Sequence, residues 1–293
     1  MVGMSTTSCD STDGIDDPIE LPAISTSDLL VKEKPIVNIP ADKNASNAKV
    51  LNFTSNDKIE KIITTCDGAF IAYVKGLTRA TSSQITGSYT VSNGMIVCTI
   101  RVAGETITVT IPQSGSGSAT VDGTPAQTTT EQQMSSGAQT ASICRTWYPT
   151  QYQAVVYSSP GKNNGERKIF GNYSAPTLKK LEETIEAETK TSINLLGGEL
   201  QKFSLLADGT IVSTINNTSE VNTWSWVNEG AAEFKASFGS DKQFQNLPGF
   251  VRYQAGTPNT AEFVLECEVD VKGKDKEIVK GYVEAIITAK DAK

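Results

Sequence analysis

Residues 88–112, SYTVSNGMIVCTIRVAGETITVTIP, predict the fold class of this chain. From 106 to 111 threonine alternates with isoleucine or valine, which is the period-two pattern of a strand with one buried face. Asn93-Gly94 separates two runs of β-favouring residues, a strong signal for a tight hairpin, and Ala103-Gly104 predicts the next turn. The segment therefore predicts a three-stranded antiparallel meander.

The second half of the chain repeats this pattern of short strands and turns. Residues 203–212 have the pattern of a hairpin through Asp208-Gly209, and residues 265–271 alternate apolar with acidic side chains. Strands at such short intervals are typical of a sandwich or a barrel. We therefore expect a mostly β protein with two antiparallel β domains.

One surface helix is predicted, at about residues 174–188. Ser174 can cap its start, and Pro176 falls in the first turn, where a missing N–H costs nothing. Leu178, Leu181 and Ile185 recur at helical spacing, and charged residues cover the other face. Because the apolar stripe is short, we expect this helix to lie on a sheet.

The composition divides the chain into four segments. Residues 1–20 predict a disordered acidic tether, since they cannot bury apolar surface. Residues 21–112 predict an N-terminal β domain and residues 143–293 a second β domain. Residues 113–142 are rich in Gly, Ser, Thr and Gln, which predicts a linker; a structured loop is the alternative.

Charge is distributed unevenly along the chain. There are 33 Asp and Glu residues against 26 Lys and Arg, and residues 1–31 contain no Lys or Arg. The remainder is close to neutral, so neither part offers the concentrated basic surface that a nucleic acid would need. No apolar run approaches the roughly 18 residues of a transmembrane helix.

Histidine is absent from the chain. This excludes Ser-His-Asp and Cys-His nucleophile systems and histidine-ligated zinc. There is also no Cys-x-x-Cys pair and no Asp-x-Asp-x-Asp loop, so we expect no metal and no cofactor. An enzyme built on this chain would have to use Asp, Glu, Lys or Tyr as its acids and bases.

Three carboxylates alternate along one predicted strand face: Glu266, Glu268 and Asp270. Residues two apart on a strand lie about 7 Å from each other, which is within reach of a glycosidase pair. The neighbouring Lys-rich turn favours a solvated outer face instead. No catalytic residue is therefore predicted.

Four cysteines follow Cys9: Cys66, Cys98, Cys144 and Cys267. In an exported chain they allow three pairings, of which Cys66–Cys98 with Cys144–Cys267 respects the domain division. Cys98 and Cys267 each share a strand face with apolar neighbours, which favours buried free thiols. Both alternatives stay open.

The run Ser5-Thr6-Thr7-Ser8-Cys9-Asp10, followed by acidic residues, resembles the lipidation site of outer-membrane lipoproteins from the Bacteroides group. The resemblance implies that Cys9 is acylated and that the protein is exported to the outer membrane or cell surface, held there by its lipid anchor alone. It also implies a signal segment upstream, because no apolar segment precedes Cys9. The alternative is an ordinary cysteine in a solvated terminus.

Arg145-Thr146-Trp147, then the predicted helix, then the Asp208-Gly209 hairpin and Trp224-Ser225-Trp226 resemble the lipocalin-like, or calycin-like, barrels of bacterial lipoproteins. The resemblance covers about residues 143–290. It implies that residues 143–293 form an antiparallel barrel that crosses over through the helix and continues as a meander.

Aromatic residues of the second half are the candidate ligand-binding groups. Trp224 and Trp226 share one strand face, and could stack on a sugar or an apolar ligand if that face lines an interior or a cleft. The full candidate set is Trp147, Tyr148, Trp224, Trp226, Phe250 and Tyr253. Packing in the core is the alternative role.

Together these patterns predict a non-catalytic cell-envelope lipoprotein. We expect it to bind a small apolar molecule or a glycan, or to act as a scaffold with a protein partner in an envelope complex. The alternatives are a histidine-free carboxylate glycan hydrolase and a fimbrial or adhesin-like subunit.

Overall fold

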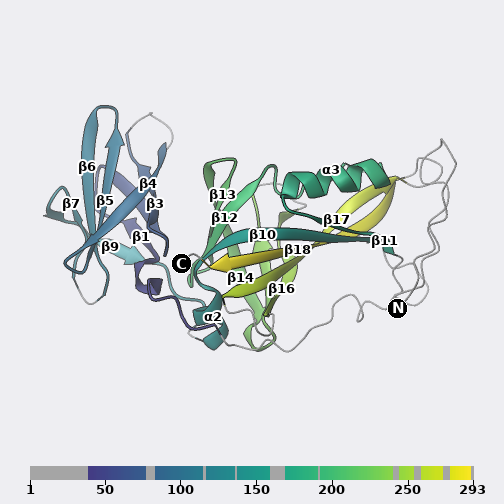
Figure 1. Ribbon diagram of the computed structural model, residues 1–293. Helices are drawn as coiled ribbons and strands as arrows, with labels where there is room; N and C mark the ends of the chain where they lie inside the picture. Colours follow the sequence, from purple (N-terminus) through teal and green to yellow (C-terminus); the bar gives the residue numbers. More distant parts are fainter. Residues whose placement is uncertain are drawn as a thin grey trace.

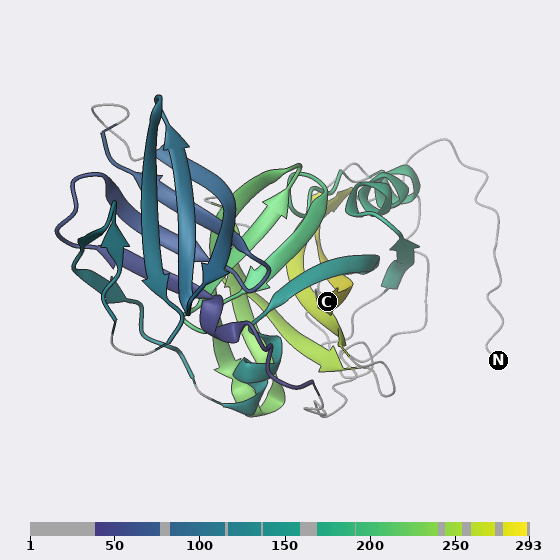
Figure 2. The ribbon, with the colours of Figure 1, turned by 60° about the vertical axis from the view of Figure 1, so that its left-hand side comes forward.

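The computed structural model describes residues 39–76, 83–114, 117–135, 137–158, 169–190, 192–239, 244–253, 259–272 and 278–291. Its fold is mostly β, as the sequence predicts: a nine-stranded antiparallel half-barrel and a closed eight-stranded antiparallel barrel, with two α-helices. The two sheets lie side by side in Figures 1 and 2, with the N-terminal sheet in purple and blue. The acidic tether and Cys9 lie outside the described residues.

The first sheet is a curled meander in the order β8-β7-β6-β5-β4-β3-β2-β1-β9. Its strands are β1 (Lys49–Phe53), β2 (Ile59–Thr64), β3 (Ala69–Val74), β4 (Ser83–Ser92), β5 (Met95–Val102), β6 (Glu105–Pro112), β7 (Thr120–Val121), β8 (Thr124–Pro125) and β9 (Thr128–Thr130). A short 3-10 helix, η1 (Ala45–Asn47), precedes them. The predicted meander is confirmed as β4, β5 and β6.

The first meander turn has the predicted geometry. Asn93 and Gly94 have φ angles of 50° and 72°, the left-handed values that a two-residue hairpin loop requires. Tyr89 pairs with Cys98 across this hairpin, and Ile107 and Val109 of β6 are buried in the half-barrel core.

The segment 113–142, which the sequence predicted as a linker, contributes structure instead. It holds β7, β8 and β9 of the first sheet and helix α2 (Ala138–Ile143). Val121 is buried in the half-barrel core, and β9 pairs with β1 along Leu51–Phe53. These strands have two or three residues each, so their pairing depends on neighbouring strands and leaves little periodic signal in the sequence.

The second sheet closes into a barrel. Its order is β11-β10-β12-β13-β14-β15-β16-β17-β18, and β18 pairs again with β10 from Trp147↔Asp291 to Ser158↔Gly281. Eight strands, β10 and β12 to β18, thus close the barrel, and β11 pairs with β10 as a ninth strand of the sheet. Its strands are β10 (Thr146–Ser158), β11 (Ile169–Ala175), β12 (Leu200–Leu205), β13 (Thr210–Ile215), β14 (Thr218–Asn228), β15 (Glu233–Ser237), β16 (Leu247–Tyr253), β17 (Thr260–Lys272) and β18 (Ile278–Asp291). The 3-10 helix η2 (Glu229–Ala231) joins β14 to β15.

The predicted helix exists as α3 (Leu178–Thr189), but it begins later than expected. Thr177 is its cap and accepts a hydrogen bond from Lys180 N, whereas Ser174 belongs to β11. Leu178, Leu181 and Ile185 are buried against the barrel, as their spacing predicts. Figures 1 and 2 place α3 on the side of the barrel away from the first sheet. Among the described residues no helix is both long enough and apolar enough to cross a membrane.

Candidate functional site

The two domains meet through an apolar cluster. Val50, Ile63 and Ile71 of the first sheet are buried against Leu206 and Val212 of the barrel. These residues lie on the sheet face that does not contribute to the half-barrel core, so the sheet is apolar on both faces where it meets the barrel. Removal of the apolar surface of these residues from water stabilises the contact between the two domains.

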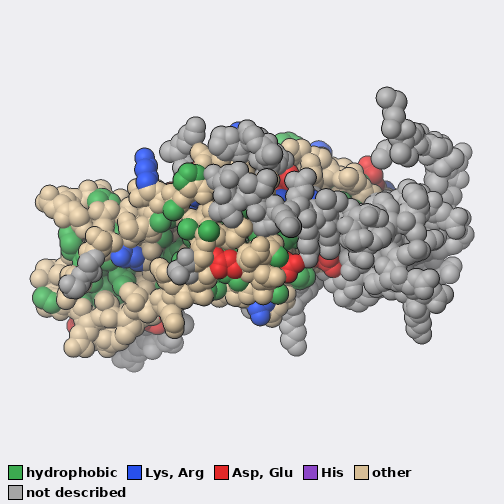
Figure 3. Space-filling view, turned by 90° about the horizontal axis from the view of Figure 1, so that it is seen from below, with side chains coloured by type: hydrophobic (Ala, Val, Ile, Leu, Met, Phe, Trp, Pro, Cys, Tyr) green, Lys and Arg blue, Asp and Glu red, His purple; other side chains and the backbone are tan. Residues whose placement is uncertain are grey.

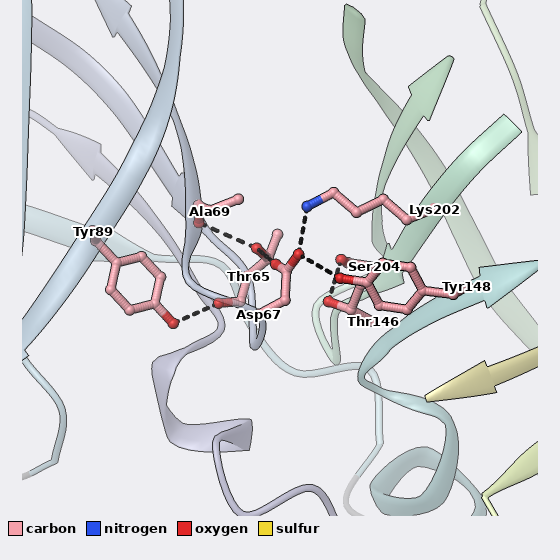
Figure 4. Close-up of polar contacts among 8 residues, drawn as sticks. All are labelled: Thr65, Asp67, Ala69, Tyr89, Thr146, Tyr148, Lys202 and Ser204. Carbon is pink, nitrogen blue, oxygen red and sulfur yellow. Dashed lines mark hydrogen bonds and ion pairs between the residues drawn. The ribbon is translucent and has the colours of Figure 1, made fainter. Parts of the chain in front are cut away.

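A polar turn crosses the boundary beside this cluster. Asp67, in the turn between β2 and β3, accepts hydrogen bonds from Lys202 Nζ of β12 and, at 3.2 Å, from the Tyr148 hydroxyl of β10 (Figure 4). Thr65 Oγ1 donates to the same carboxylate at 2.5 Å, and Tyr89 secures the turn by donating to Thr65 O at 2.6 Å. One carboxylate thus receives donors from both domains.

These hydrogen-bond partners stabilise the ionised form of Asp67. Burial acts to raise the pKa of Asp67, but the hydrogen bonds from Lys202 and Thr65 outweigh it and hold that pKa below its usual value. Burial, with the Asp67 charge, raises the pKa of Tyr148 to about 12, so its hydroxyl keeps the proton that it donates. Lys202 is therefore part of an ion pair that crosses the domain boundary.

A second polar joint lies at Arg145, whose side chain is only 3% exposed. Its guanidinium pairs with Asp291 at 3.1 Å, donates to Pro40 O and lies 5.6 Å from the centre of the Trp147 ring. These contacts tie the chain that enters the first domain to the first and last strands of the barrel. The role of Arg145 is thus to join elements rather than to meet a ligand.

Two hollows lie along the domain boundary and together form what we call the interdomain cleft. The outer hollow has a volume of about 710 Å³ and is lined by Tyr73, Gln84, Thr86, Asn217, Thr218, Ser219, Glu220, Val221, Asn222 and Gly239. The inner hollow has a volume of about 270 Å³ and is lined by Thr65, Ala69, Phe70, Ile71, Thr86, Gly87, Ser88, Lys202, Ser204, Val212, Thr214 and Ser219. Thr86 and Ser219 line both hollows, so the two are neighbours.

The two walls of the cleft are formed by strands that lie far apart in the sequence. β3 and β4 form one wall, and the barrel strands β12, β13 and β14 form the other; Figure 1 shows β3 and β4 facing the β12–β13 hairpin. Gln84 Nε2 of β4 donates to Ser219 O of β14 at 2.8 Å, which fixes the spacing of the walls where the hollows meet. Tyr73 and Val221 pack at the edge of the apolar interdomain cluster.

The lining of the outer hollow is mainly hydroxyl and amide, whereas the inner hollow combines hydroxyl groups with apolar side chains, namely Ala69, Phe70, Ile71 and Val212. Glu220 is the one carboxylate and Lys202 the one cation among the described residues that line the two hollows. Within the described parts of the chain no three Cys, Asp or Glu side chains gather closely enough to hold a metal ion. The cleft can therefore offer hydrogen bonds and the aromatic side chains of Tyr73 and Phe70, but no paired acid and base among the described residues.

The three tryptophans predicted as ligand contacts lie in or beside the barrel core. Trp147 is fully buried, donates to Ile143 O at 2.9 Å and meets Phe263 edge to face at 5.1 Å. Trp224 is buried and donates to Leu206 O, while Trp226 is half-buried and donates to Thr140 Oγ1. Every indole N–H thus has a protein acceptor.

The other predicted aromatic residues are also away from the cleft. Tyr148 is 36% exposed and binds Asp67 at the domain joint. Phe250 and Tyr253 are in strand β16 rather than in the loop-like surroundings that the sequence suggested, and both are buried. The structure therefore brings Trp224 and Trp226 together, 5.1 Å apart, but does not assemble the six into one site.

The barrel interior is almost filled. Two cavities between described residues of its interior have volumes of about 40 and 30 Å³ and share the lining residues Leu196, Phe238, Leu265 and Ile287. A drug-sized ligand occupies a pocket of roughly 300–1,000 Å³. As folded, the barrel has room for about one water-sized group in each cavity.

The structure also locates several of the other residues that were singled out from the sequence. Glu266 lines a hollow on the outside of the barrel, and the side chains of Glu268 and Asp270 lie outside the described residues. Cys66, Cys98, Cys144 and Cys267 are buried and form no disulfide, so the disulfide alternative is wrong. Burial raises the pKa of Cys66 and of Cys98 to about 12, which leaves both thiols protonated and unreactive.

Sequence reasoning missed the cleft residues. Gln84, Thr86 and Ser88 alternate as the outward side of β4, which looks like any solvated strand face. Asn217 follows β13 in a turn, where asparagine is common. Nothing local distinguishes these residues from ordinary surface positions.

No family model, no curated protein and no solved structure matches this chain.

Proposed function

We propose that this protein binds a glycan in the interdomain cleft and carries out no chemistry on it. The observation that carries the proposal is the outer hollow, about 710 Å³ in volume, in which Tyr73 lies among amide and hydroxyl side chains. Ligand sites occur preferentially at domain boundaries and have this range of volume. Sugar hydroxyls match amide and hydroxyl partners, and a sugar ring can pack on an aromatic face.

A polar ligand fits the chain better than an apolar one. The cavities of about 40 and 30 Å³ in the barrel interior are too small for such a ligand, so an apolar molecule there would have to displace packed side chains. The apolar hollow beside Phe250 on the outside of the barrel has a volume of about 240 Å³, which is about a third of the outer hollow of the cleft. The interdomain cleft, by contrast, is already open and needs no repacking. The barrel is therefore assigned the role of a rigid support for one wall of the cleft.

Binding without hydrolysis is favoured by the count of acids. Glycoside hydrolysis uses two carboxyl groups on opposite sides of the scissile bond. Glu220 is the single carboxylate that lines the outer hollow among the described residues, and the inner hollow presents Lys202 already paired with Asp67. A retained glycan is the outcome that this lining supports.

The proposed setting is the cell envelope. The Thr-Thr-Ser-Cys-Asp run supports lipidation at Cys9, and the Trp-helix-meander order of residues 143–293 supports a lipocalin-like barrel of the bacterial lipoprotein kind. We expect a palmitate analogue to label the protein in its native host, and Cys9→Ser to abolish the label. Equal labelling of both forms would contradict the anchor.

The binding proposal is tested by titration calorimetry against a panel of soluble glycans. Thr218→Trp places a large ring in the outer hollow at an exposed strand position, and we expect it to weaken binding at least about tenfold. Thr223→Trp is the matched control, since Thr223 is an exposed residue of the same strand that does not line the cleft.

Two outcomes would contradict the proposal. One is that no glycan of the panel binds the wild-type protein. The other is that a glycan binds Thr218→Trp as tightly as it binds the wild type and the Thr223→Trp control.

A further inference from the structure

The cleft is longer than one hollow. The outer hollow ends at Thr86 and Ser219, and the inner hollow begins at the same two residues. From there the inner hollow continues to Ser88 on the first sheet and to Thr214 and Lys202 on the barrel. The ligand volume is thus divided into two neighbouring parts with a shared border, and a chain of rings can occupy both parts where a compact molecule would fill one.

The junction is bordered by a hydrogen bond between the domains. Gln84 Nε2 donates to Ser219 O at 2.8 Å, with Gln84 on β4 and Ser219 on β14. Because this bond joins the two walls, the width of the cleft at the junction is set by the fold rather than by the ligand. A ligand that passes the junction contacts both domains at once.

The charges of the lining residues also determine which ligand charge is favoured. In the inner hollow the Lys202 ammonium is paired with Asp67, whose side chain is 7% exposed, so the pair presents no net charge. In the outer hollow Glu220 is the one charged side chain among the described lining residues, and it is exposed. An acidic ligand would meet Glu220 and gain no unpaired cation in return, which costs binding free energy.

Figure 3 agrees with this picture of charge for the face that it shows. On the described part of that face, Lys and Arg side chains lie singly among polar and apolar groups and do not gather in a patch. The described side chains of that face therefore form no basic patch that would attract an acidic polymer.

We infer that the ligand of the interdomain cleft is an extended, uncharged chain of sugar rings that spans both hollows, with one ring at Tyr73 and another between Ser88 and Thr214. This inference rests on the proposed function and specifies its ligand. It predicts that affinity depends on chain length, and that the two hollows contribute separately.

The test is a calorimetric titration with linear neutral oligosaccharides of one to six units, drawn from gluco-, manno- and xylo-series, and with oligogalacturonides of the same lengths. For the neutral series that binds, we expect affinity to rise at least about tenfold from one unit to the longer chains and then to level off. The acidic series should bind more weakly at every length.

Ser88→Trp separates the two hollows. Ser88 is exposed and lines only the inner hollow, so the indole should remove the gain from longer chains while short chains bind the outer hollow as before. Thr90→Trp is the control, because Thr90 is the next residue on the same face of β4 and lines neither hollow. Equal melting temperatures of the two variants would show that both fold.

The outcomes distinguish this inference from the proposed function. Sugar binding that is independent of chain length, or that favours the acidic series, overturns the inference and leaves glycan binding standing. Length-dependent binding that Ser88→Trp does not change also overturns it. Binding of an unstructured neutral peptide with no binding of any sugar contradicts both.

Discussion

Asp67 in the β2–β3 turn and Lys202 in β12 form an ion pair across the domain boundary, with side chains 7% and 27% exposed. The pair joins the β2–β3 turn to a strand that lines the inner hollow. It therefore fixes the orientation of the domains and, at the same time, neutralises the one cation that lines the inner hollow among the described residues. The stability of the joint and the chemistry of the cleft thus depend on the same two residues.

Removing Asp67 should destabilise the protein. Asp67→Ala leaves the largely buried Lys202 ammonium and the Tyr148 hydroxyl without their acceptor, and we expect a loss of about 1–3 kcal/mol in the free energy of unfolding. Urea denaturation measures it. Glu183→Ala is the control, because the Lys180–Glu183 pair is exposed and its loss should change stability by less than about 0.5 kcal/mol. Equal effects of the two substitutions would contradict the assigned role of Asp67.

Acid should weaken the same joint. The pKa of Asp67 is lower in the folded protein than in the unfolded chain, where an aspartate titrates near about 3.9. The contribution of Asp67 is therefore complete above that unfolded value and is lost as the pH falls through the lower folded value. We expect thermal unfolding between about pH 5 and 2 to show a steeper loss of stability for the wild type than for Asp67→Asn. Parallel curves would show that the charge of Asp67 does not stabilise the folded protein through this ion pair.

Trp147 should matter for folding rather than for binding. Its fully buried ring lies against Phe263, and its N–H is bound to Ile143 O, so Trp147→Ala should cost about 3–5 kcal/mol by leaving a cavity. Guanidinium denaturation measures the loss. Trp147→Phe, which keeps most of the volume, should fold and bind glycan with wild-type affinity. A selective loss of affinity in that variant would instead support the sequence prediction that Trp147 contacts ligand.

The buried thiols should be inert in the native protein. Burial keeps Cys66 and Cys98 protonated, with pKa values of about 12, and Cys144 and Cys267 are buried as well. We expect iodoacetamide at pH 8 to alkylate none of these four residues in the native protein and all four in guanidinium, as read by peptide mass spectrometry. Rapid alkylation of any of the four in the native state would show that its part of the core opens readily.

Local patterns in the sequence predict several individual elements correctly. The alternation in 106–111 and the Asn93-Gly94 turn are properties of neighbouring residues, and both are present in β5, β6 and the turn before them. The apolar stripe of α3 was also correct, although the helix begins at Leu178 because Thr177, and not Ser174, provides the cap. Cap positions depend on where the preceding strand ends, which local periodicity does not report.

The residues of the proposed site could not be predicted from these patterns. The aromatic residues that the sequence favoured are apolar, and in this fold the barrel core takes most of them. The cleft is built instead from polar residues such as Gln84 and Asn217, whose strands carry the same outward alternation as any solvated sheet. Only the docking of one sheet against the other distinguishes these positions from the rest of the surface.

The sequence specifies the strands, their turns and the buried face of the helix, because each follows from residues within a few positions of one another. Barrel closure cannot be predicted in this way. Trp147 of β10 pairs with Asp291 of β18, and no local sequence pattern links residues so far apart in the chain. The same holds for Asp67 with Lys202 and for Gln84 with Ser219. Those contacts arise from the burial of Val50, Ile63 and Ile71 against the barrel, and the cleft exists only once that burial has brought the two domains together.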